Sequence, residues 1–308
     1  MGNDYIITTD NLTKVYNKSL ALDRVSIGIH KGEILGLVGK NGAGKTTLIR
    51  ILSGIVKPTS GTFSLFGDKD PKHLPSLLKN ASCMIEHPAL YDELSGKDNL
   101  IATCLIKGMD KEVKSGYIQD RLNFVGLGAL YNSTKKVKDY SLGMKQRLGI
   151  AMATIGDPKL MMLDEPTNGL DPQGIKEIRD LLVNLNKEKG VTILISSHIL
   201  PELSKFATSY AFIDKGHILK SISEFELEKE VGKDLMIQTN DNAKAFSLLS
   251  SKGYSVTNDG VIYIKKVDDS AAVLNILNTN QLTINFFKEK DNTLEDYYMN
   301  LLGGNNNV

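Results

Sequence analysis

The sequence predicts an α/β protein in which a parallel sheet carries an inserted helical segment and precedes a small C-terminal α+β unit. Short apolar, β-branched runs recur between residues 5 and 90 and again between 157 and 220, where they alternate with helical patterns. Such alternation is typical of a parallel sheet with helices on both faces. Between residues 91 and about 156 the strand signals vanish and apolar residues recur at helical spacing, which indicates the insertion.

The strands of the core are expected to be short and buried. One run leads into a glycine-rich segment and another ends in two carboxylates. Before the insertion, strands are expected at 25–29, 34–38, 62–66 and 81–85. After the insertion, strands are expected at 160–163, 191–195, 210–213 and 218–220, with helices at about 172–188 and from residue 201.

These patterns also predict the domains. Residues 1–220 are predicted to form the large domain, with the insertion at about 91–156, where apolar residues such as Leu142 and Leu148 recur at helical spacing. Residues 221–233 are predicted to be a connector, and 303–308 a disordered tail. Between them lies the α+β unit, 234–302, with strands near 235–238, 261–265 and 283–287 and helices near 243–251, 271–278 and 294–302.

The composition excludes several classes of protein. The 308 residues are 41% hydrophobic and 24% charged with a net charge of +1, which gives no reason to expect a nucleic-acid partner. Cys83 and Cys104 lack metal-binding or redox spacing, which favours a reduced, cytosolic compartment. The N-terminus has no secretory signal, and no apolar run reaches the roughly 18 residues needed to cross a bilayer.

The glycine-rich segment follows the strand at 34–38. It fits the phosphate-binding pattern G-x-x-x-x-G-K-S/T, in which backbone N–H groups and a helix N-terminus hold phosphate oxygens. Lys45 would reach the β- and γ-phosphates and Thr46 would ligate Mg²⁺. A glycine-rich turn with a chance lysine is the alternative. The expected contacts to ATP are Gly39, Lys40, Asn41, Gly42, Ala43, Gly44, Lys45, Thr46 and Thr47.

Two carboxylates end the apolar strand at 160–163. Asp164 can hold Mg²⁺, and Glu165 can act as the general base that polarises the attacking water. A solvated pair of charges at a loop is the alternative.

With Asp171, His198 and the helical insertion, these two stretches resemble the ATP-binding subunits of ABC transporters over residues 5 to about 220. The resemblance implies a P-loop NTPase core that binds ATP and Mg²⁺. It implies that Asp171 lies in the loop joining two ATPase subunits, that His198 contacts the γ-phosphate in catalysis, and that Tyr16 stacks on adenine. For Tyr16, packing at a strand edge is the alternative.

Residues 140–147, Tyr-Ser-Leu-Gly-Met-Lys-Gln-Arg, resemble the family's signature, normally Leu-Ser-Gly-Gly-Gln. Ser141 and Gly143 would bind the γ-phosphate held by the opposite subunit, although Tyr140, Leu142 and Met144 depart from the pattern. The alternative is an ordinary helix with Ser141 as its N-cap. One phosphate loop and one signature in a chain imply a two-fold dimer that closes on ATP.

Three features are similar to bacitracin-resistance and lantibiotic-immunity ATPases: the variant signature, a glutamate at position 86, and the C-terminal unit. The resemblance implies a peripheral subunit at the cytoplasmic face of a bacterial membrane, bound there only through a separate permease. It would drive export of, or resistance to, an antimicrobial peptide. A soluble ABC ATPase acting on ribosomes or DNA and a non-hydrolysing nucleotide-binding regulator are the alternatives.

Glu86 and His87 end the strand at 81–85. From the residues alone they could be an acid/base pair, two metal ligands or a mechanical contact. The resemblance places Glu86 where most relatives have a glutamine that contacts Mg²⁺ or the attacking water, so Glu86 is expected near the metal. His87 is expected to face solvent between the core and the insertion.

Overall fold

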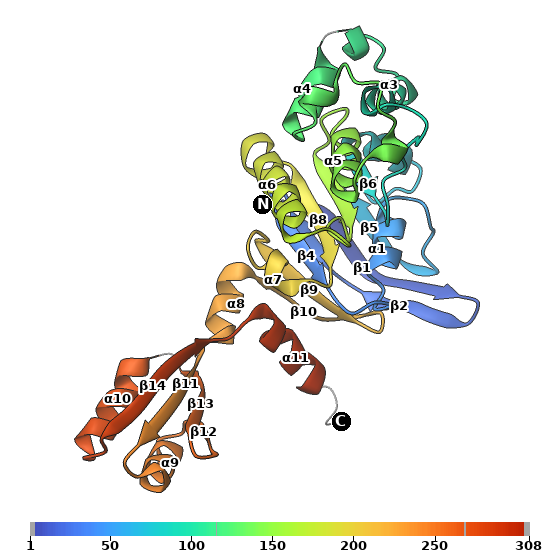
Figure 1. Cartoon of the computed structure of the whole chain (residues 1–308). Coiled ribbons are helices and arrows are strands. Elements are labelled where there is room, and N and C mark those ends of the chain that lie inside the picture. Colours follow the sequence, from blue (N-terminus) through green and yellow to red (C-terminus); the bar gives the residue numbers. More distant parts are fainter. Residues whose placement is uncertain (1–3, 115, 268, 305–308) are drawn as a thin grey trace. The chain divides into compact units, whose positions relative to one another are not determined.

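The computed structural model describes residues 4–114, 116–267 and 269–304. The chain divides into two compact units, Met1–Ile222 (the large unit) and Ser223–Val308 (the small unit). Figure 1 labels most of the helices and strands of both units.

The parallel sheet of the large unit forms as predicted. Its strands run in the order β10-β9-β4-β8-β7-β6, in which β9, β4, β8, β7 and β6 are mutually parallel, and β10 follows β9 after a two-residue turn as an antiparallel edge strand. All residues of β4, β7 and β8 are buried, which explains the apolar runs 34–38, 160–163 and 193–195 within them. The strands are β4 (Ile34–Val38), β6 (Ala81–Met84), β7 (Leu160–Asp164), β8 (Thr192–Ser197), β9 (Ser209–Asp214) and β10 (His217–Ser223).

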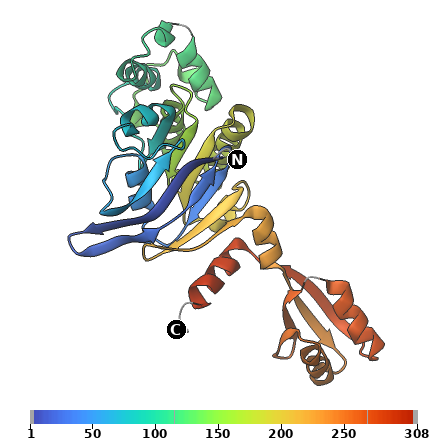
Figure 2. The same cartoon turned by 180° about the vertical axis from the view of Figure 1, so that it is seen from behind.

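A second, antiparallel sheet was not predicted as a separate layer. β1 (Tyr5–Tyr16) pairs with β2 (Ser19–Val25), β3 (Gly28–His30) and β5 (Ser60–Leu65), and β1 and β2 form the long blue hairpin seen in Figure 2. Helix α1 (Lys45–Leu52) shares one hydrophobic core with both sheets. The helix that begins in the phosphate loop is thereby fixed from two sides.

The helical insertion is confirmed. Helix α3 (Gly96–Ile106) begins at the N-cap Ser95, α4 (Tyr117–Phe124) follows, and α5 (Leu142–Ala153) begins at the N-cap Ser141. Of the apolar residues at helical spacing, Leu148 is fully buried, whereas Leu142 is 43% exposed. Leu142 is the first residue of α5 and precedes the turns that contact the core. The other helical segments of the large unit are α2 (Leu74–Leu77), η1 (Leu78–Asn80), η2 (Glu112–Lys114), η3 (Gly128–Leu130), η4 (Val137–Asp139), α6 (Pro172–Lys189) and α7 (Leu200–Leu203).

The small unit is a four-stranded antiparallel sheet with the order β12-β13-β11-β14. Buried residues alternate along β11 and β13, since only one face of the sheet meets the apolar sides of α9 and α10. Helix α8, which precedes the sheet, begins with a capping box between Ser223 and Glu226. The elements are α8 (Glu224–Val231), β11 (Lys233–Thr239), α9 (Asn242–Ser251), β12 (Ser255–Asn258), β13 (Ile262–Val267), α10 (Ser270–Thr279) and β14 (Ile284–Asp291).

The last helix corrects the predicted tail. Helix α11 (Leu294–Gly304) includes Gly303 and Gly304, which the sequence assigned to a disordered tail at 303–308. Glycine weakens a helix interior but is tolerated in a last turn that continues an established helix. The remainder of that tail, 305–308, lies outside the described residues.

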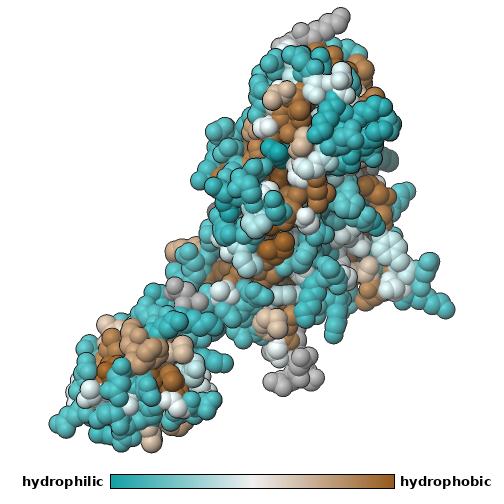
Figure 3. Space-filling view, viewed as in Figure 1, coloured by the Kyte–Doolittle hydropathy of each residue, from teal (hydrophilic) through white to brown (hydrophobic). Residues whose placement is uncertain are grey.

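The surface is mainly hydrophilic, with scattered apolar patches in the view of Figure 3. Within the described ranges, each helix is too short or too polar to cross a bilayer.

Candidate active site

The loop after β4 is a cradle that only glycine can form. Gly42 and Gly44 have φ angles of +81° and +112°. A Cβ on Gly44 would lie 2.7 Å from the carbonyl oxygen of Ala21, and a Cβ on Gly39 would lie 2.4 Å from that of Ile213. The loop therefore packs against neighbouring backbone with its glycines in conformations that other residues rarely adopt.

Lys45 sits inside this cradle, with 5% of its surface exposed. Its ammonium donates hydrogen bonds to the carbonyl oxygens of Gly39, at 2.5 Å, and Lys40, at 3.3 Å. The same nitrogen lies 3.1 Å from Oε1 of Glu165. The loop and the end of β7 are thus joined through one buried cation.

Asp164 is held by two hydroxyl groups. Thr46 Oγ1, in the first turn of α1, donates to its Oδ2 at 2.7 Å, and Ser196 Oγ, on β8, donates to its Oδ1 at 2.6 Å. Asp164 is almost fully buried. The structure thus brings together Thr46 and Asp164, two of the three metal ligands predicted from the sequence.

Glu165 contacts both of the other predicted catalytic residues. While Lys45 lies beside Oε1, the Nδ1–H of His198 donates to Oε2 at 2.7 Å. The backbone of Glu165 has a φ of +49°, and its N–H donates to Ser196 Oγ at 3.0 Å. A left-handed conformation costs a residue with a Cβ about 1 kcal/mol, and here it turns the glutamate out of the strand toward the phosphate loop side.

Ser196 was missed by the sequence analysis. Its hydroxyl donates to Asp164 and accepts from the N–H of Glu165, so that one side chain joins the carboxylate of Asp164 to the backbone of Glu165. The sequence feature that could have indicated this role is the pair Ser196-Ser197, which ends an apolar strand directly before His198. A parallel neighbour strand ending at the same edge brings such hydroxyls to the carboxylates.

The two segments predicted to meet a second subunit both begin helices. Ser141 accepts a hydrogen bond from the N–H of Met144 at 3.3 Å, and Asp171 accepts one from the N–H of Gly174 at 2.8 Å. These are ordinary N-cap contacts, which were the alternative reading for Ser141. A Cβ on Gly143 would meet Leu170 at 3.8 Å, so the two segments lie side by side. Their contact with a second nucleotide stays a prediction.

Tyr16 is at the exposed end of β1, with 37% of its surface accessible, and the Lys14 ammonium lies 4.9 Å from its ring centroid. An exposed ring is compatible with stacking on a base, and this role too stays a prediction.

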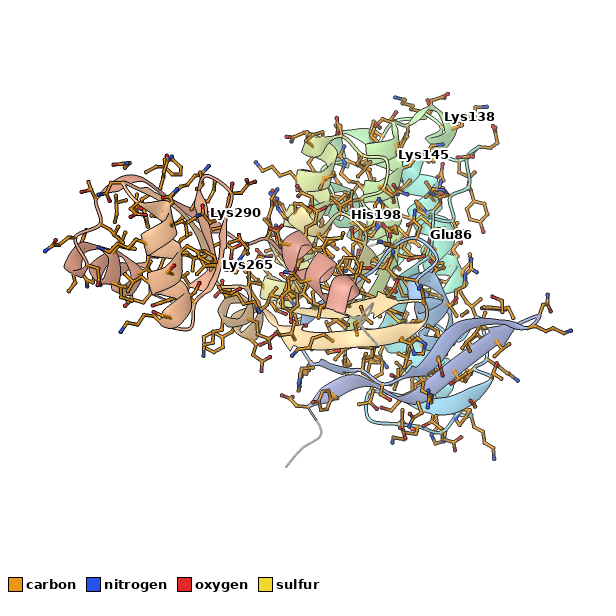
Figure 4. The ribbon with its side chains drawn as sticks, turned by 90° about the horizontal axis from the view of Figure 1, so that it is seen from below. Glu86, Lys138, Lys145, His198, Lys265 and Lys290 are labelled. Carbon is orange, nitrogen blue, oxygen red and sulfur yellow. The ribbon has the colours of Figure 1, made fainter. Side chains whose placement is uncertain are left out.

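Glu86 has a partner that the sequence did not suggest. The Nη2 group of Arg50, on α1, donates to its Oε1 at 2.6 Å, and Glu86 has a φ of +61°. Figure 4 labels Glu86 and His198, which lie on different loops of the large unit. The carboxylate is thus paired with the helix that follows the phosphate loop, and its contact with a metal ion stays a prediction. His87 is exposed, as expected.

The residues at this edge fit a nucleotide with its metal ion. The glycine cradle leaves backbone N–H groups and a buried ammonium for phosphate oxygens, and Thr46 with Asp164 offers the oxygen ligands that Mg²⁺ prefers.

Known proteins share this arrangement. The family model described as ABC transporter matches residues 22–168. The bacitracin transport ATP-binding protein BcrA of Bacillus licheniformis is 40% identical over 304 residues, which cover 97% of this chain and 98% of that protein. The chain belongs to the ATP-binding subunits of ABC transporters. The lantibiotic transport ATP-binding protein SrtF of Streptococcus pyogenes is 42% identical over 225 residues, covering 73% of this ABC ATPase and 91% of SrtF.

The solved structures agree on the fold. The structure of cbiO1 from Clostridium perfringens, part of the ABC transporter complex cbiONQ, superposes with a TM-score of 0.64 at 28% identity and covers 73% of this chain and 91% of that chain. The predicted P-loop NTPase fold of the ABC ATPase type and the predicted ATP hydrolysis by an ABC transporter subunit are confirmed.

Proposed function

We propose that this ABC ATPase closes as a dimer on ATP and Mg²⁺ and drives a separate membrane permease that confers resistance to an antimicrobial peptide of the bacitracin or lantibiotic class. The observation that carries the proposal is the 40% identity with a bacitracin transport ATP-binding protein along 97% of the chain, small unit included. The relative named for lantibiotic transport supports the same class of cargo.

The residues of the active site divide the work of hydrolysis. Bound ATP with its metal ion supplies the phosphoryl group to be transferred to water and the positive charge that neutralises it. Backbone N–H groups of residues 39–47 and the Lys45 ammonium would hold the phosphates, while Thr46 and Asp164 would hold the metal. Glu165 is positioned to accept a proton from water, and the N–H of His198 fixes the orientation of the glutamate through Oε2.

Lys45 has a second role in this scheme. In this structure its ammonium lies 3.1 Å from Oε1 of Glu165, so that this oxygen is engaged by a cation. Glu165 can take up a proton at Oε1 only when the ammonium has another anionic partner, such as a phosphate. The same lysine would therefore bind ATP and release the base.

Dimerisation follows from where the signature lies. Ser141 begins α5, and the positive end of a helix dipole suits a phosphate. Ser141, Gly143 and Asp171 would meet the nucleotide and the facing loop of a second copy, so that each phosphate loop is completed by the other chain. Opening after hydrolysis would be the stroke passed to the permease, which would also hold the protein at the cytoplasmic face of the membrane.

The proposal is tested in a susceptible bacterium that expresses this chain together with a candidate permease. We expect resistance to bacitracin or a lantibiotic, ATP hydrolysis by the purified protein, and co-purification with the permease. Glu165→Gln should lower ATP hydrolysis at least about a hundredfold and abolish resistance while ATP binding persists. Recovery with ribosomes instead of a membrane protein, or full hydrolysis by Glu165→Gln, would refute the corresponding part of the proposal.

A further inference from the structure

A second cavity of the large unit lies away from the nucleotide. Its volume is about 600 Å³, within the range of small-molecule sites. It is lined by Lys159 and Val191, which directly precede β7 and β8, and by Lys31, in the turn before β4. The nucleotide site lies at the opposite, carboxyl ends of the same three strands. The two sites are therefore on different edges of the sheet.

The wall of this cavity contains a buried arginine. The side chain of Arg121, on α4, is only 8% exposed. Its Nη2 donates to Asp157 Oδ1 at 2.6 Å and its guanidinium lies 4.3 Å from the ring centroid of Tyr117, but its Nε has no hydrogen-bond partner among the described residues. That nitrogen is also closed to solvent, so it does not face the cavity, and Arg121 contributes its positive charge rather than a free donor.

The charges around the cavity favour an anion. Lys31, Lys159 and Lys189 line it together with Arg121, against the carboxylates of Asp4 and Asp157. Asp157 is already shared between Arg121 and Lys189, whose ammonium lies 3.8 Å from it. Among the described residues, Lys31 and Lys159 form hydrogen bonds only through their backbone groups, so their ammonium groups are available to a ligand.

The floor of the cavity is apolar. Ile6, Met161, Leu185 and Val191 line it and are buried, and Phe66 adds an aromatic ring. The walls are joined by hydrogen bonds: Asn186 Nδ2 donates to the carbonyl oxygens of Gly32 at 2.8 Å and Val191 at 2.9 Å. The cavity is thus formed before any ligand arrives, with cations at its rim and hydrocarbon inside.

We propose that this cavity binds an amphipathic organic anion, a phosphate or carboxylate head attached to an apolar body. The head would lie against the ammonium groups of Lys31 and Lys159, with the charge of Arg121 nearby, and the body against the apolar floor. Such a ligand could be a dissolved metabolite or a membrane lipid, which share this chemistry.

The test is calorimetric titration of the full chain with octyl phosphate. The phosphate loop is first filled with saturating ADP and Mg²⁺, so that it cannot bind the probe. We expect saturable binding of octyl phosphate, at least tenfold tighter than that of octanol or inorganic phosphate, because only octyl phosphate satisfies both the rim and the floor. Equal binding of octanol would overturn the proposal, since the cations would then contribute nothing.

Substitutions of the lining lysines test where octyl phosphate binds. Lys31→Gln combined with Lys159→Gln should weaken binding of octyl phosphate at least tenfold, because it removes the two exposed ammonium groups that line the cavity. Lys176→Gln, which removes an exposed charge from α6, is the matched control and should bind as the unmodified protein does. Unchanged binding in the double variant would overturn the assignment.

A competition experiment separates the two sources of ligand. Vesicles containing phosphatidylglycerol displace octyl phosphate if the natural ligand is a lipid, and leave it bound if the ligand is a dissolved anion. Both lysines are exposed, so their substitution leaves the core intact and a loss of binding is not a loss of folding.

Discussion

Replacing Ser196 by alanine tests how the carboxylates of the active site are held. The change removes the hydroxyl that donates to Asp164 at 2.6 Å and accepts from the N–H of Glu165 at 3.0 Å. Asp164 is 1% exposed, so water cannot readily replace the lost donor. A hydrogen bond to a charged group contributes about 1.5–3 kcal/mol to stability, and we expect Ser196→Ala to lower the stability of the large unit by about 2 kcal/mol. Thr46 still donates to the other oxygen of Asp164, which limits the loss.

The effect on activity follows from the same contact. If the metal-binding orientation of Asp164 is destabilised by about 2 kcal/mol, Mg²⁺ binds correspondingly more weakly. The Mg²⁺ concentration for half-maximal ATP hydrolysis should then rise about thirtyfold. Hydrogen exchange of the amides of β7 and β8 measures the loss of stability in the large unit, because a chain of two units is not expected to unfold in one step.

Ser197→Ala is the matched control. Ser197 is equally buried and neighbours Ser196, but its hydroxyl accepts from the N–H of Ile199 at 2.9 Å. Its substitution should leave the Mg²⁺ dependence unchanged. If Ser196→Ala and Ser197→Ala have the same Mg²⁺ dependence and the same hydrogen exchange, Ser196 does not position Asp164.

Three further predictions rest on single contacts. Gly44→Ala should abolish ATP binding in a filter assay, because its Cβ would lie 2.7 Å from the Ala21 carbonyl oxygen. Gly67→Ala, at a φ of +82° with open space around it, should retain binding and cost only about 1 kcal/mol. Glu86→Gln breaks the 2.6 Å ion pair with Arg50 and should alter peptide resistance more than basal ATP hydrolysis; a parallel fall in both would contradict this. Hydrogen bonds from Lys136 and then Lys138 lower the pKa of Glu93 to about 2, so its contribution to stability is present above an unfolded pKa of about 4.5 and is lost as the pH falls toward 2. A carbon NMR titration should show that pKa rising when both lysines are replaced by glutamine, and a pKa unmoved by that change would exclude them as its cause.

Much of the active site could be predicted because each of its motifs is a short, continuous stretch of sequence. The phosphate loop, Asp164, Glu165 and His198 each follow an apolar strand, and the parallel sheet brings those strand ends to one edge. Ser196 could not be assigned a role, since its partners lie on another strand and the contact depends on register. The pair between Glu86 and Arg50 depends on how β6 meets α1, which no local pattern encodes.

The fold was predictable to the same extent. Continuous apolar runs predicted the buried strands of the parallel sheet. No such run marks β12 (Ser255–Asn258), because it is an edge strand with little buried surface. Leu142 has the right spacing for a core residue and yet is exposed, since periodicity cannot tell the first turn of a helix from its packed turns. The antiparallel sheet was not separated from the parallel one, because short β-branched runs look alike in both.

The position of β4 at the centre of the parallel sheet has a consequence for how the protein is made. Leu35 pairs with Leu194 on one side and with Ser209 on the other, both of which leave the ribosome long after it. The strand that leads into the phosphate loop is therefore synthesised early. It remains apolar and unpaired until most of the large unit has been synthesised. Fragments that end before Thr192 should be retained by chaperones, and nucleotide binding should begin only when synthesis has passed Asp214.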